Sequence, residues 1–370
     1  MKKFLALLLS MILVLSLTAC GGGGGEDSKP ADESKPADTQ PPADSGSEPA
    51  EGKTVKVGLI CIGDENDQGY TYNFIRGKEA ATEALAAKGI NVEWVTKWNI
   101  GEDSGCEDAN IYEGRYLAGI VAGMKLQQMI DDGEISADQA VIGYVGAFSF
   151  AEVISGFTSY FLGARSVCPS VTMKVQFVGS WSDATEEANA ASALADMGCV
   201  MISQHSDNTT PATTAQSKGV FHTGYNNDMI SVAPEASLIG TRINWAPYFE
   251  YAIESVANGE SFDQDWCHGM DMDAVVMTDL NEAIAAPGTA EKLAEVEDKL
   301  RTGDLQVFDT STFTIEGKAL ESAFALDTDG DFTPDSEEAV FDGAFHESYF
   351  QSAPYFALSI DGIEWLNSAF

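Results

Sequence analysis

The chain has 370 residues, of which 58 are acidic and 20 basic, and its formal net charge is −38. This excess of acids argues against nucleic acid as a partner and against electrostatic adhesion to anionic lipid. The chain is also longer than a single hydrophobic core usually serves, so we expect two lobes.

The N-terminus has the parts of an export signal. Lys2 and Lys3 precede an apolar run over 4–17, which is too short to span a bilayer. The run leads to Leu-Thr-Ala-Cys at 17–20, which resembles the lipobox of bacterial lipoproteins. We predict a signal peptide over 1–19 and lipidation of Cys20, which places the protein on the extracytoplasmic face of the cell membrane, held there by its lipid only. The alternative is an ordinary signal peptide with a cysteine nearby by chance.

Residues 20–52 predict a stalk. Five consecutive glycines at 21–25 are followed by a segment rich in Pro, Ala, Ser, Asp and Glu, without aromatic or branched aliphatic residues. Such a composition buries too little apolar surface to offset the entropy lost on ordering. We therefore expect a disordered tether between the lipid and a folded body.

The body alternates between two hydrophobic patterns. Short runs rich in β-branched residues predict strands, and segments with apolar residues three and four apart predict helices. This alternation predicts an α/β fold with parallel sheets flanked by helices, and ligands then bind beyond the carboxyl ends of the strands. The first strand, 55–62, is nearly continuous in apolar residues and predicts burial on both faces. The expected strands are 55–62, 92–95, 140–145, 172–178, 199–202, 220–223 and 238–243, and the expected helices are 71–88, 111–130, 152–164, 184–197 and 211–218.

The cysteines favour buried thiols. The five after Cys20 show no C-x-x-C spacing, which gives a zinc site little support and leaves room for at most two disulfides. Apolar neighbours, as around Cys61 and Cys199, are typical of buried free thiols. The five are Cys61, Cys106, Cys168, Cys199 and Cys267.

Motifs for catalysis are absent from the sequence. It contains no G-x-S-x-G, no G-x-x-x-x-G-K-[ST], no G-x-G-x-x-G and no H-E-x-x-H. His205 and Asp207 lie close together, but no activated serine or cysteine accompanies them, so we interpret them as loop hydrogen-bonding residues. We predict that the protein is not an enzyme.

Aromatic and polar side chains share the loops after the expected strands. Aromatic faces combined with a few hydrogen-bonding groups suit a planar, uncharged ligand that carries hydroxyls. The alternative reading of each residue taken singly is an ordinary loop residue. The set consists of Asp67, Tyr70, Tyr72, Trp181, Asp183, Asn226, Asn227, Asp228, Asn244 and Trp245.

Several motifs together resemble one family. Tyr-Glu-Gly-Arg-Tyr-Leu-Ala-Gly at 112–119 resembles the E-G-x-Y-L-A-G helix of the basic membrane protein family of lipoproteins. Asn-Asp-Gln-Gly-Tyr at 66–70, Val-Gly-Ser-Trp-Ser-Asp at 178–183 and Gly-Tyr-Asn-Asn-Asp at 224–228 resemble further family motifs in the same order. The resemblance covers residues 55–313. It implies a two-lobed, periplasmic-binding-protein-like (type I) fold and a binding protein that delivers a nucleoside-like solute to the permease and ATPase subunits of an ABC importer.

The resemblance also assigns roles to residues. It implies that Tyr70 and Trp181 stack on a base, and that Asp67 and Asp228 bind ribose hydroxyls or base edges. Asp183, in the motif at 178–183, is a further expected ligand-binding residue. Asn226 stands where the family often has Asp, and Asn244 where many members have Lys. Two other functions stay open, a sugar or signal receptor of the same architecture that feeds a sensor, and an anchored hydrolase.

The first lobe is expected to be small. The family normally carries a strand–helix–strand segment before the E-G-x-Y-L-A-G helix, whereas here residues 105–110 lead directly into it. We place the first lobe at 53–112 with segments returning from later in the chain, the second at 113–245, segments completing both at 246–320, and an acidic extension at 321–370.

The extension contains one candidate metal loop. Asp327, Asp329, Asp331, Asp335 and Glu338 follow the spacing of an EF-hand calcium loop. Phe332 replaces the glycine that such a loop needs at its sixth position. A solvated acidic turn is the preferred interpretation over a Ca²⁺ site, and no other cofactor is expected.

Overall fold

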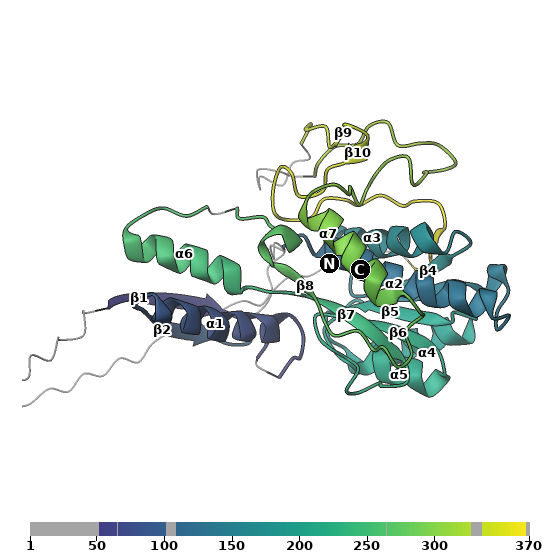
Figure 1. Cartoon of the computed structure of the whole chain (residues 1–370), viewed down its shortest axis with the longest axis horizontal. Helices are drawn as coiled ribbons and strands as arrows, with labels where there is room; N and C mark the ends of the chain where they lie inside the picture. Colours follow the sequence, from purple (N-terminus) through teal and green to yellow (C-terminus); the bar gives the residue numbers. More distant parts are fainter. Residues whose placement is uncertain (1–51, 65, 101–108, 264, 327–334, 368–370) are drawn as a thin grey trace, which may run out of the picture. The chain divides into compact units, whose positions relative to one another are not determined.

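The computed structural model describes residues 52–64, 66–100, 109–263, 265–326 and 335–367 (Figure 1). The predicted signal peptide, Cys20 and the stalk up to residue 51 lie outside these residues, as does Cys106. In the part of the chain described, no helix is both long enough and apolar enough to cross a membrane.

The smaller lobe is built from two strands and two helices. Strands β1 (Lys53–Ile60) and β2 (Ile90–Lys97) pair in parallel and are joined by helix α1 (Tyr70–Ala87). Helix α6 (Ala246–Asn258) returns from later in the chain and packs beside α1. The core of this lobe consists of Val55, Leu59, Cys61, Ala81, Leu85, Ile90, Phe249 and Ile253.

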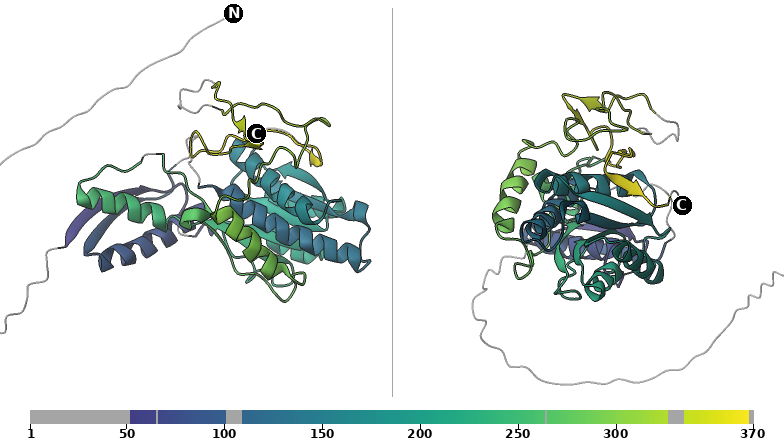
Figure 2. Two further views of the ribbon diagram at one scale, coloured as in Figure 1. Left: turned by 45° about the horizontal axis from the view of Figure 1, so that its top comes forward. Right: turned by 90° about the vertical axis from the view of Figure 1, so that its right-hand side faces the viewer.

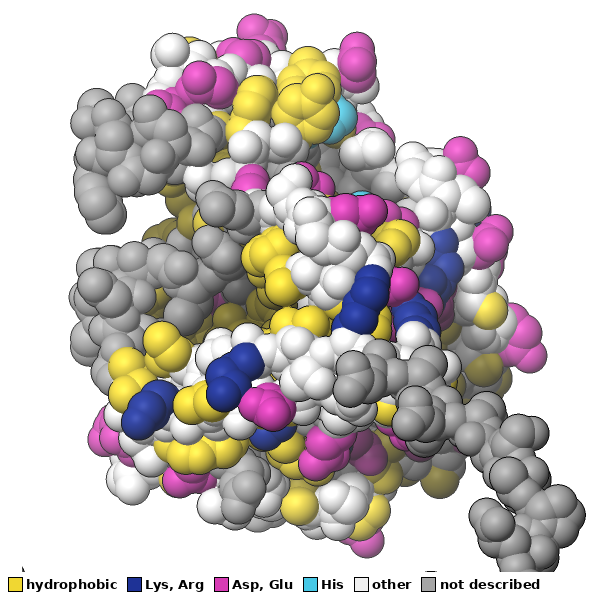
Figure 3. All heavy atoms as spheres, turned by 90° about the vertical axis from the view of Figure 1, so that its left-hand side faces the viewer, with side chains coloured by type: hydrophobic (Ala, Val, Ile, Leu, Met, Phe, Trp, Pro, Cys, Tyr) yellow, Lys and Arg dark blue, Asp and Glu magenta, His cyan; other side chains and the backbone are white. Residues whose placement is uncertain are grey.

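The prediction that the first strand is buried on both faces is wrong. Only alternate residues such as Val55 and Leu59 are buried, while Lys56 is exposed and Ile60 keeps 68% of its surface accessible. Both helices of the lobe pack on one face of the sheet, and no described element covers the other. Figure 3, which views the molecule from the side of this lobe, shows exposed apolar side chains among Lys and Arg.

The larger lobe holds a seven-stranded sheet with the order β11-β4-β3-β5-β6-β7-β8. All neighbours pair in parallel except β7 and β8, which are antiparallel. The sheet of this lobe has seven strands and that of the smaller lobe two, in keeping with the expectation of a small first lobe. The strands are β3 (Val141–Gly146), β4 (Thr172–Phe177), β5 (Met201–His205), β6 (Phe221–Tyr225), β7 (Ser237–Ile243), β8 (Val275–Met277) and β11 (Ile363–Trp365).

Helices cover both faces of this sheet, as the alternating pattern predicts (Figure 2). Helices α2 (Ile111–Asp131), α3 (Ala151–Val167) and α7 (Thr289–Arg301) contribute to the main core. Helices α4 (Ala184–Asp196) and α5 (Thr210–Lys218) pack with β3 and β5 in a second core on the opposite face. Two short 3₁₀ helices, Ala137–Gln139 and Met270–Met272, precede β3 and β8.

Described parts of the C-terminal segment pair and pack with the second lobe. Strand β11 pairs with β4 at the edge of the large sheet, and β9 (Val340–Phe341) pairs with β10 (Ala344–Phe345). The ring of Phe356 stacks on Phe308, with 4.5 Å between centroids, and both belong to the main core. The segment is rich in acidic residues, but it also contains apolar residues that pack against the second lobe.

The candidate calcium loop is only partly within the described residues. Asp327, Asp329 and Asp331 lie outside them. Glu338 accepts hydrogen bonds from Ser322 Oγ, Ala323 N and Val340 N, so its carboxylate holds the local chain. In the described ranges, no three His, Cys, Asp or Glu residues form a group that could hold a metal ion.

The described cysteines are free thiols. Cys61, Cys168 and Cys199 are buried, as their apolar neighbours predict, and Cys267 is partly buried. Burial raises the pKa of Cys199 to about 12, so this thiol stays protonated at neutral pH.

The buried carboxyl of Glu347 is expected to make the stability of the protein depend on pH. Its side chain is buried, Oε2 accepts from Phe356 N at 2.8 Å, and burial raises the pKa of the carboxyl from 4.5 to about 8. The folded chain therefore holds this proton more tightly than the unfolded chain does. The stabilisation that the protonated carboxyl gives the folded chain is complete below about pH 4.5 and is lost as the pH rises towards 8. We expect Glu347→Gln to remove a slope of up to about 1.4 kcal/mol per pH unit from the unfolding free energy.

Urea unfolding of the full chain at several pH values measures this slope. The difference between the parent and the variant isolates Glu347 from the other titrating groups, and the exposed Glu282→Gln serves as the control. Parallel pH profiles for the parent and Glu347→Gln would contradict the prediction.

Candidate functional site

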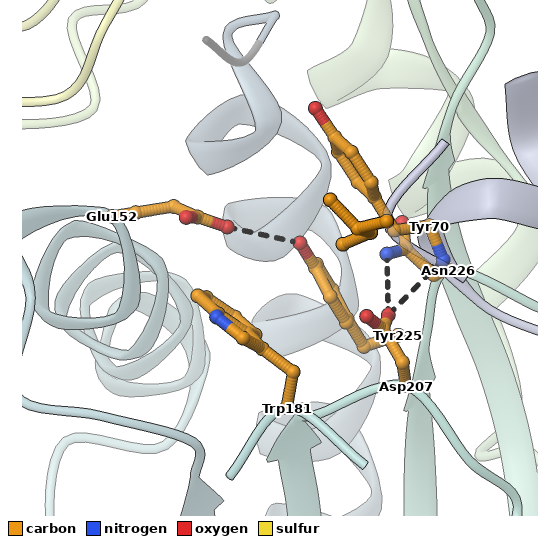
Figure 4. Close-up of a pocket in the computed structure, with 7 residues that line it drawn as sticks. Tyr70, Glu152, Trp181, Asp207, Tyr225 and Asn226 are labelled. Carbon is orange, nitrogen blue, oxygen red and sulfur yellow. Dashed lines mark hydrogen bonds between the residues drawn. The ribbon is translucent and has the colours of Figure 1, made fainter. Parts of the chain in front are cut away.

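A cavity lies between the N-terminus of α1 and the carboxyl ends of strands in the large sheet. The space between its lining atoms is about 250 Å³, part of which is open to solvent, and about 20 Å³ is accessible to the centre of a water molecule. Both lobes contribute to it. Its lining residues are Ile62, Tyr70, Glu152, Trp181, Asp207, Tyr225 and Asn226 (Figure 4).

Strand ends explain why these residues meet. Trp181 follows β4, Asp207 follows β5, and Tyr225 is the last residue of β6. Because β3, β4, β5 and β6 run in parallel, their carboxyl ends lie at one edge of the sheet. The predicted location of the ligand site, beyond these ends, coincides with the cavity.

Asp207 joins the two lobes at the site. Its Oδ1 accepts from Tyr70 N at 3.2 Å, at the start of α1, and from Asn226 Nδ2 at 2.9 Å. Only 6% of the residue is exposed, and burial raises the pKa of its carboxyl to about 7. A hydrogen bond from Asn226 opposes that rise. From its sequence context Asp207 is expected to be a loop hydrogen-bonding residue, whereas the structure places it in the cavity lining.

Asn226 forms a second link between the lobes. Its backbone oxygen and Oδ1 accept from Asn73 Nδ2, at 3.0 and 3.3 Å, and its φ of 60° lies in the left-handed region. Asparagine tolerates this conformation better than most residues. The lobes therefore meet here through hydrogen-bonded, fully buried side chains.

Aromatic rings form the apolar part of the cavity. The Tyr70 ring is held by edge contacts with Phe74 and Trp245, at centroid distances of 5.0 and 6.1 Å. The Trp181 ring meets Phe148 edge-on at 5.7 Å, and its Nε1 is buried without a partner among the described residues. Tyr70 and Trp181, both predicted from the sequence, thus reach one cavity from different lobes.

Glu152 brings a second carboxyl group to the cavity. Its Oε1 lies 3.4 Å from the Tyr225 hydroxyl, which donates to it, and 3.2 Å from His205 Nε2. His205 is fully buried, and burial, together with the positive charge of Arg115, holds its pKa well below the ordinary value. The imidazole is therefore neutral at physiological pH.

Four predicted ligand residues do not line the cavity. Each is occupied in local hydrogen bonds, because acids and amides that follow a strand also satisfy the free N–H groups of turns and helix starts. Asp67 accepts from Gly69 N, Thr71 N and Tyr72 N at the start of α1. Asp228 accepts from Ile230 N, and Asn244 Nδ2 donates to Asp273 O.

Asp183, the fourth, is the N-cap of α4. Its Oδ1 accepts from Thr185 N and Glu186 N, both at 3.0 Å. We expect Asp183→Ala to lower the unfolding free energy by about 1 kcal/mol, the usual cost of a lost cap, without changing ligand affinity. Urea unfolding and calorimetric titration of the same variant measure both quantities, and a loss of affinity without a loss of stability would show that Asp183 contacts the ligand instead.

Comparison with known proteins finds relatives that are named as binding proteins for small molecules. Residues 109–304 match the family Bmp, described as ABC transporter substrate-binding protein PnrA-like. A purine-binding protein of Brucella abortus is 28% identical over 313 residues, covering 71% of this chain and 85% of the relative. A putative ABC transporter glucose-binding protein of Haloferax volcanii, TsgA13, is 32% identical over 232 residues, covering 63% of this chain and 56% of the relative.

Solved structures support the fold. An ABC transporter solute-binding protein from Conexibacter woesei superposes with a TM-score of 0.52 at 16% identity, covering 68% of this chain and 98% of the other. One from Aeropyrum pernix gives 0.53 at 13% identity, covering 69% and 93%. These likenesses confirm the two-lobed, periplasmic-binding-protein-like architecture. The chain belongs to the Bmp family of PnrA-like ABC transporter substrate-binding proteins, which is a family of solute-binding proteins rather than a class of enzymes.

Proposed function

We propose that the protein is a lipid-anchored, extracytoplasmic binding protein that takes up a nucleoside or its base in the cavity and delivers it to an ABC permease and its ATPase. The observation that carries this proposal is the cavity lining, in which Tyr70 and Trp181 offer aromatic faces from different lobes beside Asp207 and Asn226. A flat base gains from contact with aromatic faces, and its polar edge needs hydrogen-bonding partners. The purine-binding relative supports the same ligand class.

A ligand screen of the full chain, purified in detergent, tests the proposal. Adenosine, guanosine, inosine and their free bases are compared with glucose by thermal unfolding and then by calorimetric titration. A nucleoside at one hundred times its dissociation constant should add about 2.7 kcal/mol to the unfolding free energy. Unfolding curves that no nucleoside or base shifts would overturn the proposed ligand class.

A sugar is the second candidate ligand. The relative named as a putative glucose-binding protein favours it, and aromatic rings beside carboxyl groups also suit the faces and hydroxyls of a sugar. In that case the protein could serve an importer or, as a receptor, a sensor. Stabilisation by glucose without stabilisation by any nucleoside would select this function.

The lipid anchor is tested at Cys20. We expect Cys20→Ala to leave the protein unprocessed or to release it from the membrane, because the thiol is the site of lipid attachment in the proposed lipobox. Fractionation of cells and labelling with a palmitate analogue follow the two outcomes. Normal processing with the variant still lipid-labelled would contradict the prediction.

A further inference from the structure

Arg115 is a fully buried arginine in α2, behind the cavity. Its Nη1 donates to the backbone oxygen of Gly224 at 2.7 Å, and its Nη2 donates to Ser203 Oγ at 2.7 Å and to the Tyr144 hydroxyl at 3.1 Å. Its Nε has no partner among the described residues. None of these acceptors is a carboxylate, so no direct ion pair neutralises the charge within the part of the chain described.

Three tyrosine rings surround the guanidinium. Those of Tyr144, Tyr160 and Tyr225 have centroids 5.5, 5.1 and 5.7 Å from its central carbon. Cation–π contacts lower the cost of burying a charge but do not remove it. A fully buried charge without a counter-ion is unfavourable, which points to compensation from a more distant carboxylate.

A hydrogen-bond chain leads from Arg115 to such a carboxylate. The Tyr144 hydroxyl, which accepts from Arg115, lies 3.4 Å from His205 Nδ1. His205 Nε2 lies 3.2 Å from Glu152 Oε1, and Glu152 lines the cavity with 14% of its side chain exposed. We call this series of contacts the Arg115–Glu152 chain.

The hydrogen bonds of the Arg115–Glu152 chain can all be donated in the same direction, from Arg115 towards Glu152. Arg115 can only donate, so the Tyr144 oxygen accepts from it and its own proton is free to go to His205 Nδ1. The neutral imidazole then carries its proton on Nε2 and donates it to Glu152. Each hydrogen bond in this arrangement is donated in the direction of Glu152, so Glu152 accepts from His205 and also from the Tyr225 hydroxyl. Hydrogen bonds that a carboxyl group accepts favour its ionised form.

We propose that Arg115, acting through Tyr144 and His205, keeps Glu152 as a carboxylate in the cavity and so makes the cavity select bases that carry an amino group. The proposal rests on the proposed function and deepens it. A carboxylate only accepts hydrogen bonds, so it favours a ligand edge with N–H donors over one without them. Glu152 is then a specificity-determining residue, and the other three are positioning residues.

Two tyrosines provide a matched pair of variants that test the Arg115–Glu152 chain. Tyr144 and Tyr160 are both buried with their rings on Arg115, but the Tyr160 hydroxyl accepts from Thr223 Oγ1 and takes no part in the Arg115–Glu152 chain. Tyr144→Phe therefore interrupts the chain while leaving Arg115 bonded to Ser203. Tyr160→Phe removes a hydroxyl of the same kind without interrupting it.

The first experiment needs no ligand. Nitrogen NMR of the histidine-labelled full chain in detergent, with the His205 signals assigned through His205→Gln, reports which imidazole nitrogen carries the proton. We expect a neutral ring protonated on Nε2 in the parent and in Tyr160→Phe, and altered nitrogen shifts in Tyr144→Phe. A charged His205, a ring protonated on Nδ1, or shifts that Tyr144→Phe does not change would each overturn the chain.

The second experiment measures selectivity with adenosine and purine riboside, which lacks the amino group. We expect the parent to prefer adenosine about tenfold, the order of a charge-assisted hydrogen bond. Glu152→Gln should remove most of this preference, Tyr144→Phe should reduce it, and Tyr160→Phe should preserve it. A ratio of affinities is insensitive to a general loss of stability.

Two results of the selectivity measurement contradict the proposal in different ways. Equal binding of the two nucleosides by the parent, or an unchanged ratio in Tyr144→Phe, would overturn the selectivity while leaving nucleoside binding intact. A parent that binds neither nucleoside would overturn the selectivity, while the screen with guanosine, inosine and the free bases would decide the proposed function, and the imidazole signals would decide the Arg115–Glu152 chain separately.

Discussion

Gly119→Ala is expected to destabilise the protein by about 3 kcal/mol, because it forces a methyl group between two helix backbones. A Cβ built at Gly119 in α2 would lie 2.0 Å from the backbone oxygen of Tyr160 in α3. The contact is reciprocal, since a Cβ at Gly163 would lie 2.1 Å from the backbone oxygen of Tyr116. Backbone atoms cannot turn aside as a flexible side chain can, so the helices would have to separate.

The sign of this effect is informative. In an isolated helix, alanine is more favourable than glycine by about 1 kcal/mol, so the substitution would stabilise α2 if its backbone were free of neighbours. A net loss therefore measures the helix–helix contact directly. That contact positions Arg115 and Glu152, which lie on α2 and α3.

Urea unfolding of the full chain, followed by circular dichroism, measures the loss. Gly58→Ala is the control, because nothing lies within 4 Å of a Cβ built there. We expect that variant to unfold within about 0.5 kcal/mol of the parent, as surface substitutions usually do. A stable Gly119→Ala protein would show that the helices can move apart without cost.

Hydrophobic periodicity predicted the strands and α-helices up to residue 243 well, but it predicted none of those that follow, such as α6, α7 and β8. The helix expected over 111–130 is α2 (Ile111–Asp131), and the strand expected over 172–178 is β4 (Thr172–Phe177). Periodicity succeeds here because these elements pack against a large core that uses their apolar faces. It failed for β1, where the apolar residue Ile60 lies on a face that no described element covers.

The candidate site was only partly predictable, for a physical reason. Tyr70, Trp181 and Asn226 were predicted and line the cavity, but Asp67, Asp183, Asp228 and Asn244 satisfy local backbone groups instead. An acid after a strand can cap a helix or face a ligand, and sequence alone does not separate the two uses.

The residues that were missed share another property. Asp207, Glu152 and Tyr225 owe their place to contacts across the fold, such as those of Asp207 with Tyr70 and Asn226. Each follows or ends an expected strand or begins a helix, so its position was visible in the sequence. Its partners, distant in sequence, were not.

Trp181→Ala is expected to weaken nucleoside binding at least tenfold while the fold is retained. Trp181 lies in the loop after β4 with its ring on the cavity, beside the hydrogen-bonded pair Glu152 and Tyr225 (Figure 4). Stacking of a base on an aromatic ring contributes about 1–3 kcal/mol, and 1.4 kcal/mol corresponds to a factor of ten. The loop position limits the cost to stability, because the ring is only partly buried.

Two further variants separate stacking from other effects. Trp181→Phe keeps a smaller aromatic face and removes Nε1, which is buried without a partner among the described residues, so its loss of affinity measures Nε1 and the lost ring area together, and the further loss in Trp181→Ala measures the remaining stacking. Trp365→Phe changes a tryptophan of the C-terminal strand that packs on Phe157 and Phe177 instead of the cavity, and it should leave affinity unchanged. Calorimetric titration of adenosine into the three variants and the parent decides the matter. Parental affinity in Trp181→Ala would remove the cavity as the nucleoside site, because no stacked base could lose this ring without losing binding energy.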